Sequence, residues 1–308
     1  MNHLNSLITN PIFKEQFADY YTNVKSEIGN QRRWEHFIEI GKTGERKYRI
    51  KMRQLFDAQL SDIIGNLTRK SVKADQSIGY IDEDNLADWK YYRIQYNLFG
   101  QLELPGIMTA WADLELEALE VGISFDVVLP DVLTAVTNRA NLFSDSVINE
   151  TRQALHQVIV DSINAGDGIP QLEKKIRALY GNMSKARAIR IARTEMIWAQ
   201  NEGAEKSYIQ SGVVEFKEWW TAKDERVCPY CAEMHGKRIN LGENYFGLGQ
   251  SLTILVGGKA QTMVFNYENI RHPPLHPHCR CTLIPIVYNL ASITGQRYYV
   301  NINLKKAA

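Results

Sequence analysis

The sequence predicts an α+β fold with a largely helical N-terminal half, followed by helices plus a small mixed β unit in the C-terminal half. Up to about Gly212, apolar residues recur at spacings of three and four, which is the period of a helix packed on one face. After Gly212, short runs of β-branched and aromatic residues alternate with glycines, which is typical of strands and turns. A chain of 308 residues also exceeds a typical single domain, so two compact units are expected.

The expected organisation has three regions. We expect a helical N-terminal domain at residues 1–140, a domain of helices and strands at 141–290, and a C-terminal tail at 291–308. The tail is expected to fray, because chain ends without anchoring contacts rarely order.

Helices are expected at three places in the first half. Residues 12–28 carry a stripe with helical spacing, and residues 46–66 repeat the pattern. A further helix at 86–100 is expected to stop at Gly100, since glycine commonly ends helices. The run SFDVVLP at 124–130 is interpreted as a short strand.

The helical signal strengthens from about residue 131. One helix is expected to end at Gly166, and Pro170 suits the first turn of the next, which is expected to end at Gly181. Ser184 can then cap a long helix that reaches about Gly212.

Short strands are expected after Gly212. The candidates are VVEFKEWWTA at 213–222, TILVGG at 253–258, TMVFNY at 262–267 and CTLIPIVY at 281–288. Within the first of them, Trp219 and Trp220 are expected to be core residues, because large aromatic side chains are usually buried.

Composition excludes several classes of protein. Lys plus Arg number 36 and Asp plus Glu 35, so no overall positive charge draws the molecule to nucleic acid. No apolar run has membrane-spanning length, and the first residues lack a signal-peptide pattern, so no membrane partner is expected. Neither a Walker A sequence nor a complete dinucleotide-binding fingerprint occurs.

All four cysteines lie in one window as two pairs. Cys228 and Cys231 form a C-x-x-C pair, whose spacing lets two thiolates reach one metal from a tight turn. If the segment around Cys279 and Cys281 is extended, these residues project to one side, because side chains two apart on a strand share a face. Together with His276, they predict a closed structural zinc site.

Other states of these cysteines remain open from the residues alone. The thiols could stay reduced and buried, or form disulfides after the protein leaves the cell. The C-x-x-C pair could also be redox-active. A second histidine, His278, makes the ligand set uncertain.

One segment has a strong local charge. Residues 174–193 hold seven basic residues and no acidic one. We expect Lys185, Arg187 and Arg190 to contact DNA phosphates without sequence preference. Arg193 and Glu195 adjoin a packed stripe and are expected to be structural.

The combined motifs resemble the phage Mu F-like head morphogenesis family over about residues 140–288. The pattern is "ARTE" with a downstream asparagine, a tryptophan, D-x-x-V-C-x-x-C and P-x-H-P-x-C-R-C. It is carried by Ala192, Arg193, Thr194, Glu195, Asn201, Trp220, Asp224, Val227, Cys228, Cys231, Pro274, His276, Pro277, Cys279, Arg280 and Cys281.

The resemblance implies a minor capsid protein of a tailed phage. Such proteins associate with the portal protein during procapsid assembly, with scaffold or major capsid protein as further partners, and bind double-stranded DNA and support genome delivery. They are made in the host cytoplasm and end in the virion, in the head interior or at the portal vertex. No established catalytic activity comes with the family, so no enzyme is expected, and structural zinc is a common inference for it.

The competing hypothesis is a zinc-supported nuclease of the HNH or treble-clef kind. Cysteine pairs that flank histidines also occur there, with a histidine activating water. His235, His272 or His278 would then be the base.

Overall fold

A computed structural model describes residues 27–73, 81–222 and 224–287. The helix expected at 12–28 and the C-terminal tail therefore lie outside the described residues. The helices and strands, in chain order, are α3 Glu27–Lys73, η1 Glu83–Asn85, α4 Trp89–Ala118, α5 Pro130–Asn164, α6 Ile169–Ser211, β1 Val214–Trp220, α7 Pro229–Met234, β2 Arg238–Asn240, β3 Ser251–Val256, β4 Lys259–Val264 and β5 Thr282–Val287. The predicted α+β class, with helices first and a small β unit last, is confirmed.

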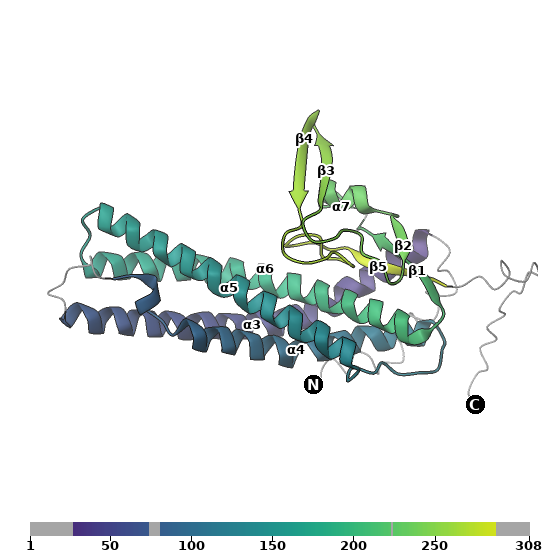
Figure 1. The fold of residues 1–308 in the computed structure, drawn as a ribbon, viewed down its shortest axis with the longest axis horizontal. Helices are drawn as coiled ribbons and strands as arrows, with labels where there is room; N and C mark the ends of the chain where they lie inside the picture. The colour runs from purple at the N-terminus through teal and green to yellow at the C-terminus, as the bar shows by residue number, and fades with distance from the viewer. Residues whose placement is uncertain (1–26, 74–80, 223, 288–308) are drawn as a thin grey trace, which may run out of the picture.

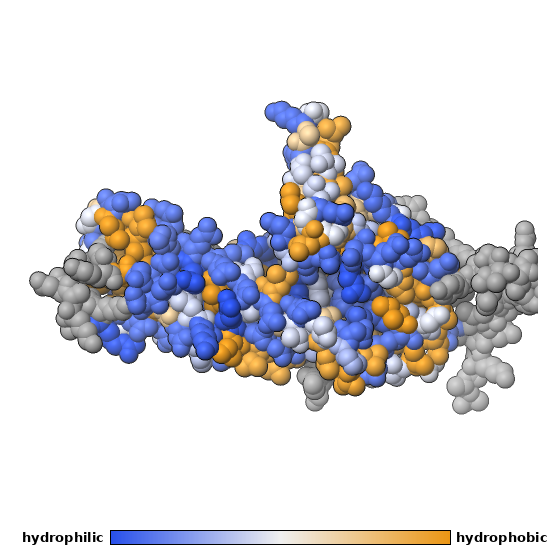
Figure 2. Space-filling view, viewed as in Figure 1, coloured by the Kyte–Doolittle hydropathy of each residue, from blue (hydrophilic) through white to orange (hydrophobic). Residues whose placement is uncertain are grey.

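Four long helices form an elongated bundle. α6 packs along both α3 and α4, and α5 packs mainly on α4 (Figure 1). A large apolar core runs between them, and the face seen in Figure 2 is mostly hydrophilic. None of the helices among the described residues is long and apolar enough to cross a membrane.

Two expectations for the bundle are wrong. α4 continues past Gly100, because this glycine lets α4 approach α5: a Cβ added there would lie 3.1 Å from the Cβ of Ala140. Similarly, α6 runs without a break through Gly181 and Ser184. Packing of these helices on their neighbours outweighs the cost of about 1 kcal/mol for an interior glycine.

The run at 124–130 is a loop rather than a strand. Its backbone bonds to helices instead of to a sheet: the N–H of Phe125 donates to Asp113 at 2.8 Å. By contrast, the predicted helix ends at Gly166 and Gly212 are confirmed. Both glycines have left-handed backbones, with φ of 68° and 66°.

The β unit sits on α6, near the end of that helix (Figure 1). β1 is the centre of an antiparallel sheet in the order β2-β1-β5, and β3 and β4 form a separate two-stranded ribbon that projects from the molecule. The four predicted strands are thus confirmed. Trp219 and Trp220 are buried as expected.

The chain has no obvious gap at the predicted domain boundary. Residue 140 lies within α5, and helices from both sides of it share one bundle. The division at residues 140 and 290 stays a prediction. Below, the "C-terminal unit" means residues 214–287, and the "bundle" means α3 to α6.

Candidate metal centre

The first cysteine pair opens a short helix. Cys228 precedes α7, and its sulfur accepts a hydrogen bond from the N–H of Cys231 at 3.3 Å. Pro229 occupies the first turn, where a missing N–H costs nothing. The C-x-x-C sequence thus folds into a capped turn in which backbone N–H groups support sulfur.

The second pair lies just before β5. The strand begins at Thr282, so Cys279 and Cys281 stand at its entrance rather than within it. Both thiols are nevertheless buried on one side. Arg280, between them, turns away and bonds Asp224 at 2.6 and 2.7 Å, as alternation along an extended chain predicts.

The two pairs converge although they are 48 residues apart along the chain. The Sγ atoms of Cys231 and Cys279 are 3.8 Å apart. Nε2 of His276 lies 2.9 Å from Sγ of Cys228 and 3.1 Å from Sγ of Cys231. Two triads result, one of Cys228, Cys231 and His276 and one of Cys231, Cys279 and Cys281, each with its donor atoms within 4.8 Å of one another.

These donors suit a structural zinc ion. Thiolate and imidazole are its usual ligands, and zinc–sulfur bonds of about 2.3 Å in a tetrahedron separate sulfur atoms by about 3.8 Å. The Cys231–Cys279 distance equals that separation, whereas the Nε2–Sγ distances of 2.9 and 3.1 Å are those of hydrogen bonds and would lengthen to about 3.5 Å around the ion. All four cysteines are free thiols, and 3.8 Å is far beyond the length of a disulfide bond, about 2.05 Å.

The electrostatics favour the thiolate at two of the four cysteines. Hydrogen bonds from Cys231 and His276 outweigh burial and lower the pKa of the Cys228 thiol to about 4. Burial opposes ionisation of Cys279, but hydrogen bonds from Cys231 and Cys281 lower its pKa. The hydrogen bond with Cys228 raises the pKa of Cys231, and burial raises the pKa of Cys281.

Burial disfavours charged His276, but its hydrogen bond with Cys228 and the negative charge of the Cys279 thiolate raise the imidazole pKa to about 9, so a metal would have to displace the proton from Nε2. Nδ1 of His276 donates to the carbonyl of Pro277 at 2.7 Å, which orients the ring and leaves Nε2 facing the sulfur atoms.

Several motif residues anchor the C-terminal unit to the bundle. The side chain of Asn201 on α6 accepts from the N–H of Leu283 at 3.0 Å and donates to the carbonyl of Cys281 at 3.2 Å. Trp34 on α3 donates to the carbonyl of Arg280 at 2.5 Å. The entrance to β5, which carries the second cysteine pair, is thus fixed by two helices.

The "ARTE" residues hold the helices together. Arg193 pairs with Glu45 of α3 at 3.1 Å. Glu195 accepts two hydrogen bonds, both 2.8 to 2.9 Å, from Arg139 of α5. The structural role predicted for Arg193 and Glu195 is confirmed.

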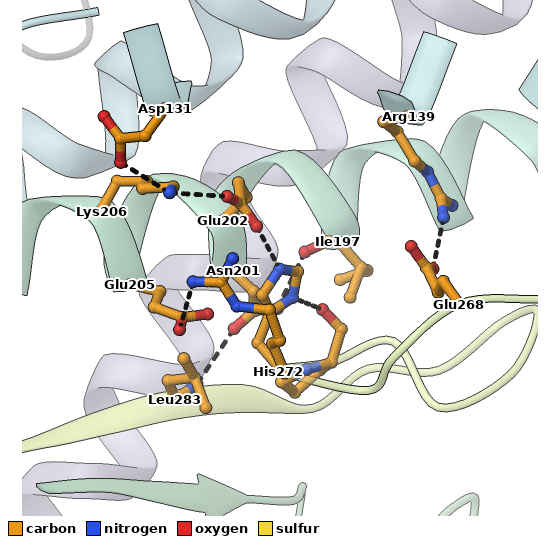
Figure 3. A network of polar contacts seen from close by, with 12 residues as sticks. Asp131, Arg139, Ile197, Asn201, Glu202, Glu205, Lys206, Glu268, His272 and Leu283 are labelled. Atoms are coloured by element: carbon orange, nitrogen blue, oxygen red, sulfur yellow. Dashed lines mark hydrogen bonds and ion pairs between the residues drawn. The ribbon is translucent and has the colours of Figure 1, made fainter. Parts of the chain in front are cut away.

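A buried ionic network also joins the two parts of the molecule (Figure 3). His272 bonds Glu202 at 2.6 Å, and Arg271 and Lys217 reach Glu205 at 2.8 and 2.7 Å. No sequence pattern revealed this network, because its partners lie 12 to 70 residues apart and carry no motif spacing. Glu202, Glu205 and His272 could geometrically surround a cation, yet the neighbouring lysine and arginine already neutralise Glu205.

The three histidines of the nuclease hypothesis occupy different surroundings. His272 has acceptors at both ring nitrogens, Glu202 and the carbonyl of Pro273, so neither nitrogen is free for water. His235 packs on Trp220 and accepts from the N–H of Thr221 at 3.3 Å. His278 is exposed, has φ of 64° and does not join the sulfur cluster.

The basic residues expected to bind DNA separate into two groups. Lys185 is exposed and Arg190 is 41% exposed, with Glu150 at 3.2 Å. Arg187 points into the bundle and is only 5% exposed, donating to Thr151 at 2.7 Å and to the carbonyl of Val147 at 2.9 Å. A phosphate contact by Arg187 would require it to leave these partners.

The fold and the site define a helix bundle that carries a small β unit, in which cysteine and histidine side chains cluster. Residues 153–284 match the family model described as Phage Mu protein F like protein, so the resemblance seen in the motifs is confirmed for that segment. The family points to phage head morphogenesis and to the virion as the location of the protein. A search of curated proteins found no match, and neither did a search of solved structures.

Proposed function

We propose that the protein is a minor component of a phage head that binds the portal protein and supports procapsid assembly and genome delivery. The observation that carries the proposal is the family match over 153–284, within which the motif residues have structural partners. Residues that hold the fold together, rather than take part in a reaction, suit an assembly protein.

We further propose a structural zinc ion held by four of the five donors Cys228, Cys231, Cys279, Cys281 and His276. The ion would supply a rigid crosslink between α7 and the entrance of β5. In small metal sites the binding free energy is folding free energy, so the C-terminal unit would depend on the ion for its shape.

The assembly role can be tested in phage particles. We would complement a phage lacking this gene with the wild-type protein or with Cys279→Ser, and measure infectious titre and co-purification with the portal protein. We expect the wild type to restore both and Cys279→Ser to lose both. Glu233→Gln, an exposed change on α7, is the matched control and should behave as wild type. Normal titre without the protein, or its absence from purified heads, would refute the proposal.

DNA binding is the second part of the role. Lys185 and Arg190 are accessible, and removing one phosphate contact should reduce the slope of log affinity against log salt by about 0.9. The double variant Lys185→Gln, Arg190→Gln should therefore bind a short duplex with a slope shallower by about 2. A slope equal to that of the wild type would remove these residues from the DNA surface.

The nuclease alternative now depends on His278, the exposed member of the three histidines. Purified protein would be incubated with plasmid and Mg²⁺ or Mn²⁺. Nicking that His278→Ala abolishes without unfolding the protein would favour the enzyme, and intact plasmid would favour the structural role.

A further inference from the structure

A second concentration of positive charge lies on α3, outside the basic segment at 174–193. Between positions 42 and 53 the chain carries six basic residues and a single acidic one, Glu45. Glu45 is itself occupied by Arg193 of α6. The middle of α3 therefore has a large excess of positive charge.

Three of these residues form a row along one side of the helix. Arg46, Arg49 and Arg53 follow each other at steps of three and four, so they share a face. Arg46 and Arg53 are exposed and Arg49 is half-buried. No acidic side chain in the described parts of the chain forms an ion pair with any of the three.

The row borders α6. The two helices run antiparallel, and their register is given by Glu45 with Arg193 at 3.1 Å and by Gln59 with Tyr180 at 3.1 Å. One turn along each helix from the Glu45–Arg193 pair, Arg49 comes level with Arg190. A further turn brings Arg53 level with Lys185.

One acid, Glu150 of α5, lies beside this border. Glu150 pairs with Arg190, but this single carboxylate faces several basic residues at that end of the surface. Positive charge therefore continues from α3 across to α6.

We propose that Arg46, Arg49 and Arg53 of α3, together with Lys185 and Arg190 of α6, form one surface that binds the phosphate backbone of duplex DNA. The inference rests on the DNA-binding part of the proposed function and adds a helix to it. Seven residues of helix span about 10 Å, which matches about three phosphate steps of one strand, and packed helix axes lie about 8–10 Å apart. Arg46, Arg49 and Arg53 form one row. Lys185 and Arg190, in contrast, are five positions apart in the sequence and lie about 140° apart around α6. A row of cations without aromatic side chains suits backbones rather than unstacked bases.

α3 itself offers a matched control. Lys47 and Lys51 lie on the opposite flank of the same stretch and are exposed. The pair Arg49→Gln, Arg53→Gln and the pair Lys47→Gln, Lys51→Gln remove the same charge from the same helix. Any difference between them reports position and not net charge.

The experiment measures affinity for a 20-base-pair duplex by fluorescence anisotropy over a series of salt concentrations. We expect Arg49→Gln, Arg53→Gln to make the slope of log affinity against log salt shallower by about 2, at about 0.9 for each phosphate contact removed. We expect Lys47→Gln, Lys51→Gln to leave the slope as in the wild type. Circular dichroism confirms that both variants stay folded.

Three results would overturn the inference, and they separate it from the proposed function. Equal slopes for both pairs would mean that only net charge matters. A slope that responds to Lys185→Gln, Arg190→Gln but not to the α3 arginines would retain DNA binding and exclude α3. A wild-type protein that binds no duplex would refute DNA binding and this surface together.

Discussion

The bundle and the C-terminal unit reach stability by different means. The bundle has one continuous core drawn from four long helices, whose side chains are almost entirely aliphatic and aromatic. The main core of the C-terminal unit contains ten buried residues, and three of them are cysteines. A small core buries too little apolar surface to hold short strands and glycine-rich loops by itself, so it depends on crosslinks.

The attachment between the two regions includes buried charged and polar groups. Arg33 of α3 donates to Glu115, to Tyr208 at 2.5 Å and to the carbonyl of Leu283 on β5. Such buried charges are costly when one partner is removed, whereas an apolar contact weakens gradually. The C-terminal unit should therefore fail first and abruptly.

The largest expected effect is removal of the metal. A chelator, or Cys231→Ser, should unfold the C-terminal unit while most of the helical circular dichroism remains, because structural zinc contributes on the order of 10 kcal/mol to such folds. Elemental analysis under reducing conditions and limited proteolysis with mass spectrometry would detect the change. If the protein contains no zinc and resists both chelator and protease, the C-terminal unit does not depend on a metal crosslink, and the two regions do not differ in this way.

The next effect tests the bundle. Arg139→Leu leaves Glu195 buried without its partner and should lower the free energy of unfolding by about 3–5 kcal/mol. The double variant Arg139→Leu, Glu195→Leu removes the stranded charge and should recover much of the loss. Urea denaturation measures both, and a double variant as unstable as the single one would contradict this explanation.

Acid should weaken the buried ionic network that joins the bundle to the C-terminal unit. Burial disfavours ionised Glu202, but its hydrogen bond with His272 and the surrounding positive charges lower its pKa from 4.5 to about 2. The ionised form is thus bound more tightly in the folded state, so its stabilisation exists above pH 4.5 and disappears as pH falls towards 2. Glu202→Gln should be less stable at about pH 7, yet lose less stability between about pH 5 and pH 3 in urea titrations. Parallel curves for the two proteins would remove Glu202 from the acid response.

The smallest effect separates two neighbouring arginines. Arg187→Gln removes the buried hydrogen bonds that Arg187 donates to the hydroxyl of Thr151 and to the carbonyl of Val147, which still bond each other, and should cost about 1–3 kcal/mol. Arg190→Gln changes an exposed side chain and should cost less than about 0.5 kcal/mol. Thermal melts of the two variants make the comparison, and equal losses would show that burial does not distinguish them.

Local sequence was sufficient for the elements that end in a strong local signal. Gly166 and Gly212 end helices because each adopts a left-handed backbone that other residues avoid. Gly100 carries the same signal but lies inside α4, where it packs against Ala140 of α5. The same residue type thus has opposite outcomes, and the difference is tertiary.

The site divides in the same way. Spacing alone indicated that Cys228 with Cys231, and Cys279 with Cys281, each act as a pair, because short-range geometry orients neighbouring side chains. The sequence by itself therefore determined the helix and strand content and the chemistry of the cluster. Only the tertiary structure decided that the pairs meet, that Arg187 faces inward and that α3 lies beside the basic side of α6. Burial and long-range contacts depend on how distant segments pack, and no local spacing encodes them.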